Sequence, residues 1–227
     1  MDVDLIYILN SEASAKSITI KGEQHKYLIK VRRHEAGDML SLRNPNEMKV
    51  LYSYEIVHID ARKLMLKLLS FDEKEVDATR KLHIAWCSID TKSIEKVLPS
   101  LSEIGVDKIS FISCDRSQNN FKLDFDRFHR ILESSMQQSG RSSFIEFDRY
   151  KNIGSFLDKF PDTKVFDFCE KTLDNTRDIK RVLIGCEGGF SHEERELLKT
   201  KEVFRLDTPM VLRSQSAVVA VASKLLL

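Results

Sequence analysis

The chain has 227 residues, 42% of them hydrophobic and 31% charged, which is enough apolar material to bury a core and excludes a mainly disordered chain. Its formal net charge of +1 excludes a strongly basic nucleic-acid-binding protein, so a site for a polyanion must be local. The four cysteines lie far apart without a C-x-x-C pair, and we expect unpaired core residues in a reducing cytoplasm and no metal site. The start, MDVDLIYILN, is acidic and no uncharged apolar run reaches the length of a membrane span, so neither a signal peptide nor a membrane partner is expected.

The first 70 residues have mostly strand-like patterning. Segments rich in Leu, Ile, Val and Tyr at 38–43, 49–59 and 63–69 alternate with turn residues such as Asn44-Pro45-Asn46. They predict a small β domain over residues 1–72, and the polar, charged segment 71–81 is the candidate linker.

From residue 82 onward the pattern predicts strands that alternate with helices. Buried strands are expected at 82–89, 108–113, 144–147, 164–168, 181–186 and 202–206. Helices are expected from about residue 94 to a stop at Gly105, from 125 to Gly140, from a capping box at 191–194 to about 201, and from Ser214 to the end. This alternation predicts an α/β domain with a mainly parallel sheet over residues 73–227.

The segment LIGCEGGF at 183–190 is the strongest local signal for a site. Three of the eight glycines, Gly185, Gly188 and Gly189, fall within five positions after a predicted strand. Glycines allow positive φ and close approach of a ligand to the backbone, and ligands of parallel sheets bind at the carboxyl ends of strands. An ordinary tight turn explains the motif equally well. The glycines do not follow the G-x-G-x-x-G order of a nicotinamide-dependent oxidoreductase, and no Walker G-K-[ST] is present.

Three weaker features accompany the glycine motif, and each also has a simple structural explanation. The segment LDTPMVLRSQSAVVAVAS at 206–223 leads an apolar loop into a small-residue helix, which is also typical of a capped core helix. The segments DRSQNN at 115–120 and SMQQSGR at 135–141 place arginines and amides on loops, where sites usually lie, or simply complement a helix end. Residues 16–33 hold six basic side chains against a single acid, Glu23, which suits a phosphate-binding face or a solvated amphipathic helix.

In their order and spacing these features resemble the bacterial small-subunit rRNA uridine-N3 methyltransferases, the RsmE family of the SPOUT class. The resemblance covers nearly the whole chain, through HKYLIKVRRHEAGDML, KSIEKVLPSLSEIGVDKI, DRSQNN, QQSGR, LIGCEGGFSHEE and LRSQSAVVAVA. It implies a PUA-like RNA-binding β-barrel and an α/β domain whose C-terminal trefoil knot forms an S-adenosylmethionine pocket. It further implies a cytoplasmic homodimer that methylates N3 of a uridine in the 16S rRNA of the small ribosomal subunit.

The resemblance also implies which residues form the site. The cofactor would lie among three groups of residues: Phe168, Cys169 and Glu170; Gly185, Glu187, Gly188 and Gly189; and Leu206, Leu212, Arg213, Ser214 and Ala217. The RNA would be bound by Lys26, Lys30, Arg32, Arg33 and Gln138. Two positions depart from the family pattern. Cys186 stands where a proline is common, and Gln215 stands where a glutamate is common, which removes a carboxylate.

Methyl transfer from a sulfonium to N3 of uracil needs an accessible base, loss of the N3 proton and in-line alignment. No histidine or carboxylate in the motifs is an obvious base. Arg116 and Arg141 are therefore the candidate catalytic residues, which would stabilise negative charge on the uracil carbonyls. Two alternatives stay open. One is a non-catalytic ribosome-associated RNA-binding protein, favoured by the departures at 186 and 215, and the other is a SPOUT methyltransferase with a different RNA target.

Overall fold

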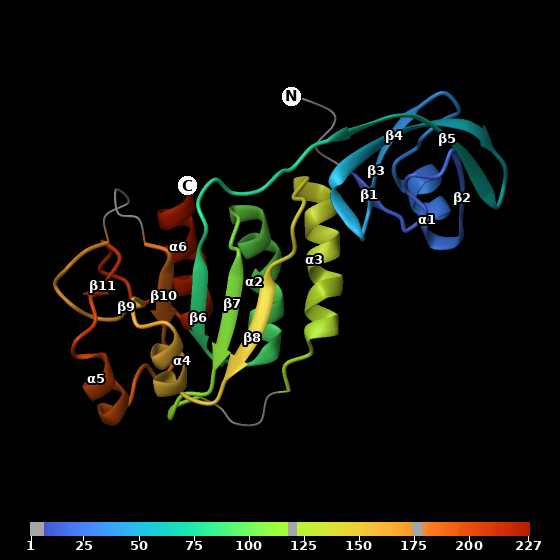
Figure 1. The fold of residues 1–227 in the computed structure, drawn as a ribbon. Helices are drawn as coiled ribbons and strands as arrows, with labels where there is room; N and C mark the ends of the chain where they lie inside the picture. Colours follow the sequence, from blue (N-terminus) through green and yellow to red (C-terminus); the bar gives the residue numbers. More distant parts are fainter. Residues whose placement is uncertain (1–6, 118–121, 174–178) are drawn as a thin grey trace. The chain divides into compact units, whose positions relative to one another are not determined.

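The computed structural model describes residues 7–117, 122–173 and 179–227, which form two compact units (Figure 1). The first unit consists of Met1–Asp77 and Met136–Ser143, and the second of Ala78–Ser135 and Phe144–Leu227. The structural division thus lies after residue 77, later than the predicted boundary at 72. It also assigns a short segment from the middle of the chain to the first unit. The reason is local, because Val76 and Ser142 exchange hydrogen bonds through their backbones and the Ser142 hydroxyl.

The first unit is built on a curled, mixed five-stranded sheet. Its strands are β1 (Ile8–Leu9), β2 (Ser17–Lys21), β3 (Met39–Asn44), β4 (Glu47–Ile59) and β5 (Lys63–Glu73), in the order β1-β3-β4-β5-β2. Only β1 pairs in parallel, with β3, and the other pairings are antiparallel. The three predicted strands correspond to β3, β4 and β5, whereas the short β1 and β2 were not predicted.

One face of this sheet encloses the core of the first unit. A short helix α1 (Gly22–Lys26) continues into a π-helical turn η2 (Tyr27–Val31) and buries His25 and Leu28. The core side chains alternate along the strands, as a sheet with one buried face requires. They are Ala13, Ile18, Ile20, Leu28, Leu40, Leu42, Tyr52, Tyr54, Ile56, Leu64 and Leu66.

The second unit contains a six-stranded parallel sheet, which confirms the predicted α/β class. Its strands are β6 (His83–Cys87), β7 (Lys108–Ile112), β8 (Glu146–Tyr150), β9 (Lys164–Phe166), β10 (Arg181–Ile184) and β11 (Val203–Phe204). Their order is β11-β9-β10-β6-β7-β8, and every pairing is parallel. Strand β6 is buried along its whole length, as expected for a parallel strand with helices on both faces.

Among the described residues, five helices accompany this sheet. They are α2 (Thr91–Ile104), α3 (Phe125–Ser139), α4 (Ile153–Lys159), α5 (His192–Leu198) and α6 (Ser214–Leu226). Helices α2, α3 and α6 pack on one face, where Phe111 and Trp86 contact α3 and α6, and α4 packs on the other (Figure 1). Helix α4 was not predicted from the sequence. It begins at Asn152, whose side chain accepts a hydrogen bond from the Ser155 N–H at 2.8 Å.

Local end signals in the second unit were predicted correctly. Helix α2 ends at Gly105 in the left-handed conformation, with φ 102°. Helix α5 begins with a complete capping box, in which the Ser191 hydroxyl accepts from the Glu194 N–H and the Glu194 carboxylate accepts from the Ser191 N–H. Both are interactions between residues close in sequence, which explains why the sequence pattern was sufficient to predict them.

The expectation that all four cysteines are unpaired was wrong. Cys87 and Cys114 form a disulfide with their Cα atoms 5.7 Å apart, while Cys169 and Cys186 are free. The pairing follows from the sheet, because β6 and β7 are adjacent and Cys87 is in register with Ile112, two residues before Cys114. The spacing of the cysteines in the sequence does not indicate that these two strands are adjacent.

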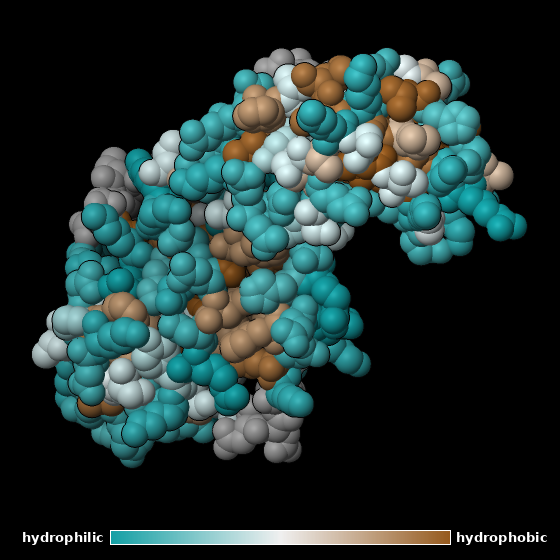
Figure 2. Space-filling model, turned by 45° about the vertical axis from the view of Figure 1, so that its right-hand side comes forward, coloured by the Kyte–Doolittle hydropathy of each residue, from teal (hydrophilic) through white to brown (hydrophobic). Residues whose placement is uncertain are grey.

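Among the described residues, none of the helices combines the length and apolarity that crossing a membrane requires. In the same part of the chain, no group of His, Cys, Asp or Glu side chains is arranged to hold a metal ion. Hydrophilic residues dominate the view in Figure 2, and hydrophobic residues gather on the visible face of the first unit and in the middle of the visible face of the second.

Candidate cofactor site

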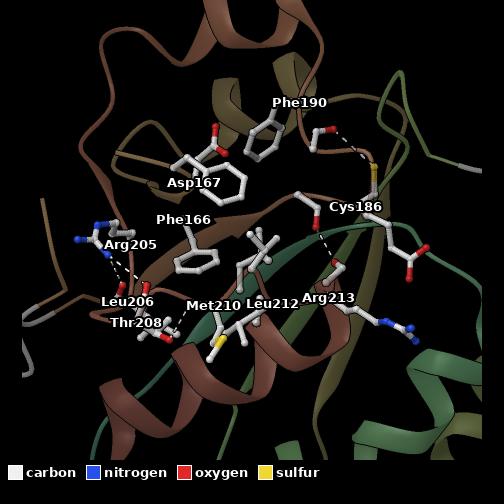
Figure 3. Close-up of a pocket in the computed structure, with 18 of the residues that line it drawn as sticks. Phe166, Asp167, Cys186, Phe190, Arg205, Leu206, Thr208, Met210, Leu212 and Arg213 are labelled. Atoms are coloured by element: carbon white, nitrogen blue, oxygen red, sulfur yellow. Dashed lines mark hydrogen bonds between the residues drawn. The ribbon is translucent and has the colours of Figure 1, made fainter. Parts of the chain in front are cut away.

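A cavity of about 870 Å³ opens where β9 and β10 end, at the carboxyl edge of the parallel sheet (Figure 3). Ligands of open α/β sheets bind at this edge. Three segments enclose the cavity: the end of β9, the turn after β10, and the loop that leads into α6. The lining residues are Phe166, Asp167, Phe168, Ile184, Gly185, Cys186, Glu187, Gly189, Phe190, Arg205, Leu206, Thr208, Pro209, Met210, Val211, Leu212, Arg213, Ser214 and Ala217.

The turn after β10 forms one wall and depends on its glycines. Gly189 has φ +66°, in the left-handed region that strains other residues, and its N–H bonds to the Cys186 carbonyl at 3.0 Å. A side chain at Gly188 would lie 3.1 Å from the Cβ of Arg116, closer than ordinary packing allows. Two of the three clustered glycines thus have a structural reason, one conformational and one steric.

The segment that begins at Asp115 is fastened to this turn. The Asp115 N–H donates to the Glu194 carboxylate at 2.9 Å, and the Ser191 hydroxyl donates to the Asp115 carboxylate at 2.5 Å. Arg116 follows, and its guanidinium donates to the Gly188 carbonyl at 2.9 Å. The structure therefore brings Arg116 to the glycine turn, 72 positions away in the sequence. Residues 118–120 of the DRSQNN segment lie outside the described residues.

The loop from Arg205 to Arg213 and the first turn of α6 form the opposite wall. Arg205 holds its start, because its guanidinium donates to the carbonyls of Leu206 at 3.2 Å and Thr208 at 3.4 Å. Met210 and Val211 are largely exposed at its tip. In Figure 3, Met210 and Leu212 lie on the side of the cavity away from Asp167 and Phe190. This wall therefore presents apolar side chains and backbone groups.

The end of β9 contributes a carboxylate to the cavity. The side chain of Asp167 is 11% exposed and forms an ion pair with Arg195 of α5. Its remaining oxygen lone pairs can accept hydrogen bonds from hydroxyl or ammonium groups. Phe166 lies beside it, so the third side of the cavity combines an aromatic ring with a negative charge.

Most of the predicted cofactor residues lie together on this cavity. Those that line it are Phe168, Gly185, Glu187, Gly189, Leu206, Leu212, Arg213, Ser214 and Ala217. Cys169, Glu170 and Gly188 are not among the lining residues. The Cys169 thiol donates to the Lys171 carbonyl, Glu170 is exposed, and Gly188 packs against Arg116.

Sequence reasoning missed several lining residues, above all Phe166, Asp167 and Phe190. Phe166 and Asp167 lie near the carboxyl end of the strand predicted at 164–168, and the carboxyl end of a parallel strand is the signal that could have identified them. Phe190 follows the glycines, and its ring occupies the space beside Gly185, where an added Cβ would lie 3.4 Å from it. No spacing pattern indicates that these side chains meet Leu212 across a cavity.

Arg141 lies in the first unit, and the structure does not place it on the cavity. Its side chain is 6% exposed, with the guanidinium 3.5 Å from the Asp77 carboxylate and 3.3 Å from the Ser143 hydroxyl. The Tyr7 hydroxyl donates to the Arg141 carbonyl at 2.7 Å. Burial, the leading cause, raises the pKa of Tyr7, so this hydroxyl stays protonated and remains a donor. Arg141 is therefore an anchor of the first unit.

The predicted RNA-binding residues are on the surface of the first unit. Lys26, Lys30, Arg32 and Arg33 are exposed, and Gln138 is exposed on the last turn of α3. Arg33 has φ 58°, an uncommon conformation for a residue with a side chain. Tyr27 is 46% exposed between Lys26 and Lys30, so an aromatic ring accompanies the charges.

Comparison with known proteins places the chain in a family. A family model described as an RNA methyltransferase domain matches residues 76–226. Ribosomal RNA small subunit methyltransferase E of Helicobacter pylori strain J99 is 37% identical over 96% of this chain and 97% of its own length. Ribosomal RNA small subunit methyltransferase E 2 of Borreliella burgdorferi is 28% identical, with 86% and 84% covered.

A solved structure has the same fold as this chain. Ribosomal RNA small subunit methyltransferase E from Neisseria gonorrhoeae, bound to S-adenosyl methionine, superposes with a TM-score of 0.75 at 15% identity, over 96% of this chain and 95% of that one. The cavity lies within the matched RNA methyltransferase domain, and the Helicobacter relative is similar along almost the whole chain. This chain belongs to the ribosomal RNA small subunit methyltransferase E family.

Proposed function

We propose that this protein transfers a methyl group from S-adenosylmethionine to N3 of a uridine in the 16S rRNA of the small ribosomal subunit. The observation that carries the proposal is the cavity at the ends of β9 and β10, in a chain 37% identical to a ribosomal RNA small subunit methyltransferase E. The uridine and its N3 position come from the family resemblance. Action in the cytoplasm as a homodimer with a trefoil knot is part of the same proposal, and these three features stay predictions.

The cavity suits S-adenosylmethionine in size and in chemistry. Pockets for ligands of this size are roughly 300–1,000 Å³ and mostly apolar, with a few polar groups that fix orientation. Phe166, Ile184 and Leu212 offer apolar contact for an adenine ring. The Asp167 carboxylate offers acceptors for ribose hydroxyls or an ammonium group, and the glycine turn lets a ligand approach the bare backbone.

The bound cofactor would supply an electrophilic methyl group on a sulfonium. The protein's own contribution is alignment, since in-line transfer to N3 depends on orientation and exclusion of water. N3 carries a proton and lies on the pairing edge of uracil, so the base must be turned outward and the proton must leave. Arg116 is proposed to stabilise negative charge on the uracil carbonyls, because it lies at the glycine turn and is exposed. The catalytic role of Arg141 also stays a prediction, to be separated from its contacts with Asp77 and Ser143.

The first unit is proposed to bind the RNA. Lys26 and Lys30 are exposed on one short helical segment, which also carries the exposed ring of Tyr27. Lysines beside an exposed aromatic ring suit a single-stranded segment, in which phosphates meet the charges and a base stacks on the ring. Arg32, Arg33 and Gln138 are proposed as further contacts of the same unit. The near-neutral net charge then restricts non-specific binding to other RNA.

The function is tested by transfer of a labelled methyl group from S-adenosylmethionine to small ribosomal subunits from a strain that lacks the gene. We expect one labelled uridine in 16S rRNA and a reverse-transcription stop at that position, because an N3-methyl group blocks pairing. Subunits from the parent strain are the control and should accept no label. Label on a ribose, on a guanine or on tRNA would contradict the assignment to uridine N3.

The non-catalytic alternative predicts a different result. Gln215 replaces a glutamate that is common in the family, and its side-chain oxygen is buried without a hydrogen-bond partner among the described residues. A binding protein with a degenerate site would associate with small subunits and show no heat of binding with S-adenosylmethionine. Calorimetry with the purified protein therefore separates the two functions before any RNA is needed.

A further inference from the structure

A buried hydrogen-bond relay joins the two walls of the cavity. The indole Nε1 of Trp86, in the middle of the sheet, donates to the Ser214 hydroxyl at 2.9 Å. The Ser214 hydroxyl in turn donates to the Gly185 carbonyl at 2.6 Å. Trp86 is fully buried and Ser214 is 4% exposed, so water does not compete for either bond. The relay connects β6, the first residue of α6 and the first residue of the glycine turn.

The direction of the relay is determined by its chemistry. An indole N–H can only donate, so the hydroxyl of Ser214 must accept from Trp86. Its hydrogen is then directed to the Gly185 carbonyl, which can only accept. If the Ser214 hydroxyl is lost, the indole N–H and the Gly185 carbonyl lose this hydrogen-bond partner together. A buried polar group without a partner destabilises the folded protein.

Capping of helix α6 does not explain the hydrogen bonds of the Ser214 hydroxyl. The residue that caps α6 is Arg213, whose side chain makes no capping hydrogen bond. A serine at a helix start usually bonds to its own helix, whereas this hydroxyl bonds to a turn 29 positions earlier in the chain. Its contacts thus tie two segments of the cavity to each other.

We propose that Trp86 and Ser214 are positioning residues that set the distance between the two walls of the S-adenosylmethionine pocket. Gly185 and Gly189 line one wall, and Ser214 and Ala217 line the other. Trp86 does not line the cavity and acts on it only through Ser214. The inference rests on the proposed use of S-adenosylmethionine, and it adds a cofactor-affinity role for a residue of the core.

The test compares Ser214→Thr with Ser214→Val, because these two side chains have nearly the same volume and only threonine keeps the hydroxyl. Calorimetry with S-adenosylmethionine should give a Kd for Ser214→Thr within about twofold of wild type. Ser214→Val should raise the Kd about tenfold, the effect of losing one well-formed hydrogen bond. The KM for S-adenosylmethionine should rise in parallel, while kcat at saturating cofactor stays within about twofold, since the reacting atoms are not touched.

A spectroscopic measurement tests the relay without cofactor. Trp86 is the chain's single tryptophan, so its fluorescence reports this site alone. Loss of the hydroxyl acceptor in Ser214→Val should shift the emission to shorter wavelength than in Ser214→Thr. Trp86→Phe, which keeps an aromatic ring without the N–H, is the second variant and should raise the Kd in the same direction as Ser214→Val.

The outcomes distinguish this inference from the proposed function. Wild-type protein that binds S-adenosylmethionine, with equal Kd values for the threonine and valine variants, would overturn the positioning role and leave the function intact. Wild-type protein that does not bind S-adenosylmethionine would overturn the proposed function and the inference with it. A higher Kd together with an unchanged kcat for both Ser214→Val and Trp86→Phe is the supporting result.

Discussion

Lowering the pH from 7 to 5 is expected to destabilise the second unit through one buried imidazole, His83. This side chain belongs to a polar chain that crosses four adjacent strands, β10, β6, β7 and β8. Arg181 Nε lies 3.0 Å from His83 Nδ1, His83 Nε2 lies 2.6 Å from the Ser110 hydroxyl, and that hydroxyl bonds to Asp148. The Asp148 carboxylate also pairs with Lys108 at 3.1 Å.

The protonation state of His83 follows from these partners. A guanidinium only donates, so Nδ1 of His83 must be the unprotonated acceptor, and Nε2 carries the hydrogen given to Ser110. Burial first, and then the positive charge of Arg181, lower the pKa of His83 from 6.5 to about 4. Protonation would place two positive groups face to face in a site that is 7% exposed.

The sign and the size follow from linkage. Because the folded pKa is below the unfolded value, the stabilisation is complete above pH 6.5 and is lost as the pH falls toward 4. Between pH 7 and pH 5 the loss is about 2 kcal/mol of unfolding free energy. Lys164 and Lys171 lower the pKa of Glu202 to about 2. The stabilisation that Glu202 contributes is lost mainly below pH 4.5, so it has little effect between pH 7 and pH 5.

Urea unfolding followed by Trp86 fluorescence measures the effect, since Trp86 lies on the same strand as His83. The wild type should lose about 2 kcal/mol between pH 7 and pH 5. His83→Gln keeps a donor for Ser110 but cannot be protonated, so it should lose much less. His192→Gln, at an exposed position of α5, is the matched control and should behave as wild type. Equal losses in wild type and His83→Gln would refute the reasoning.

Three further predictions follow from the site and its supports. Arg141→Ala should destabilise the first unit by about 1–3 kcal/mol in thermal unfolding, because it removes the cation beside the partly buried Asp77 carboxylate. Unchanged stability would contradict the anchoring role. Gly189→Ala should lower the unfolding free energy by about 1–3 kcal/mol, because φ at this position is +66°. Gly154→Ala, inside α4, should raise the unfolding free energy by about 0.5–1 kcal/mol. Thermal unfolding should therefore show opposite shifts of Tm for the two variants. Arg116→Ala should reduce methyl transfer about 100-fold while the Kd for S-adenosylmethionine changes less than about threefold; full activity would exclude a catalytic role for this arginine.

The sequence by itself determined the local elements, and the family resemblance named many of the residues that line the cavity. The capping box at Ser191, the stop at Gly105 and the alternation of strands with helices depend on residues within one or two turns of each other, so periodicity and end signals were sufficient. The glycine cluster marked one wall correctly, because positive φ at Gly189 is a property of the local backbone. Strands β1 and β2 were not predicted, although β2 alternates between exposed and buried residues.

Only the tertiary structure decided which of these local features meet. The strand order β11-β9-β10-β6-β7-β8 brings Trp86 to Ser214, 128 positions later in the chain, and Cys87 beside Cys114. This strand order cannot be predicted from the spacing of residues in the sequence. The same holds for Arg141, which the sequence grouped with Arg116 and which the structure assigns to the first unit, with Tyr7 134 positions away. The reason is that hydrophobic periodicity states which face of an element is buried, whereas the partner on that face depends on how all strands pack together.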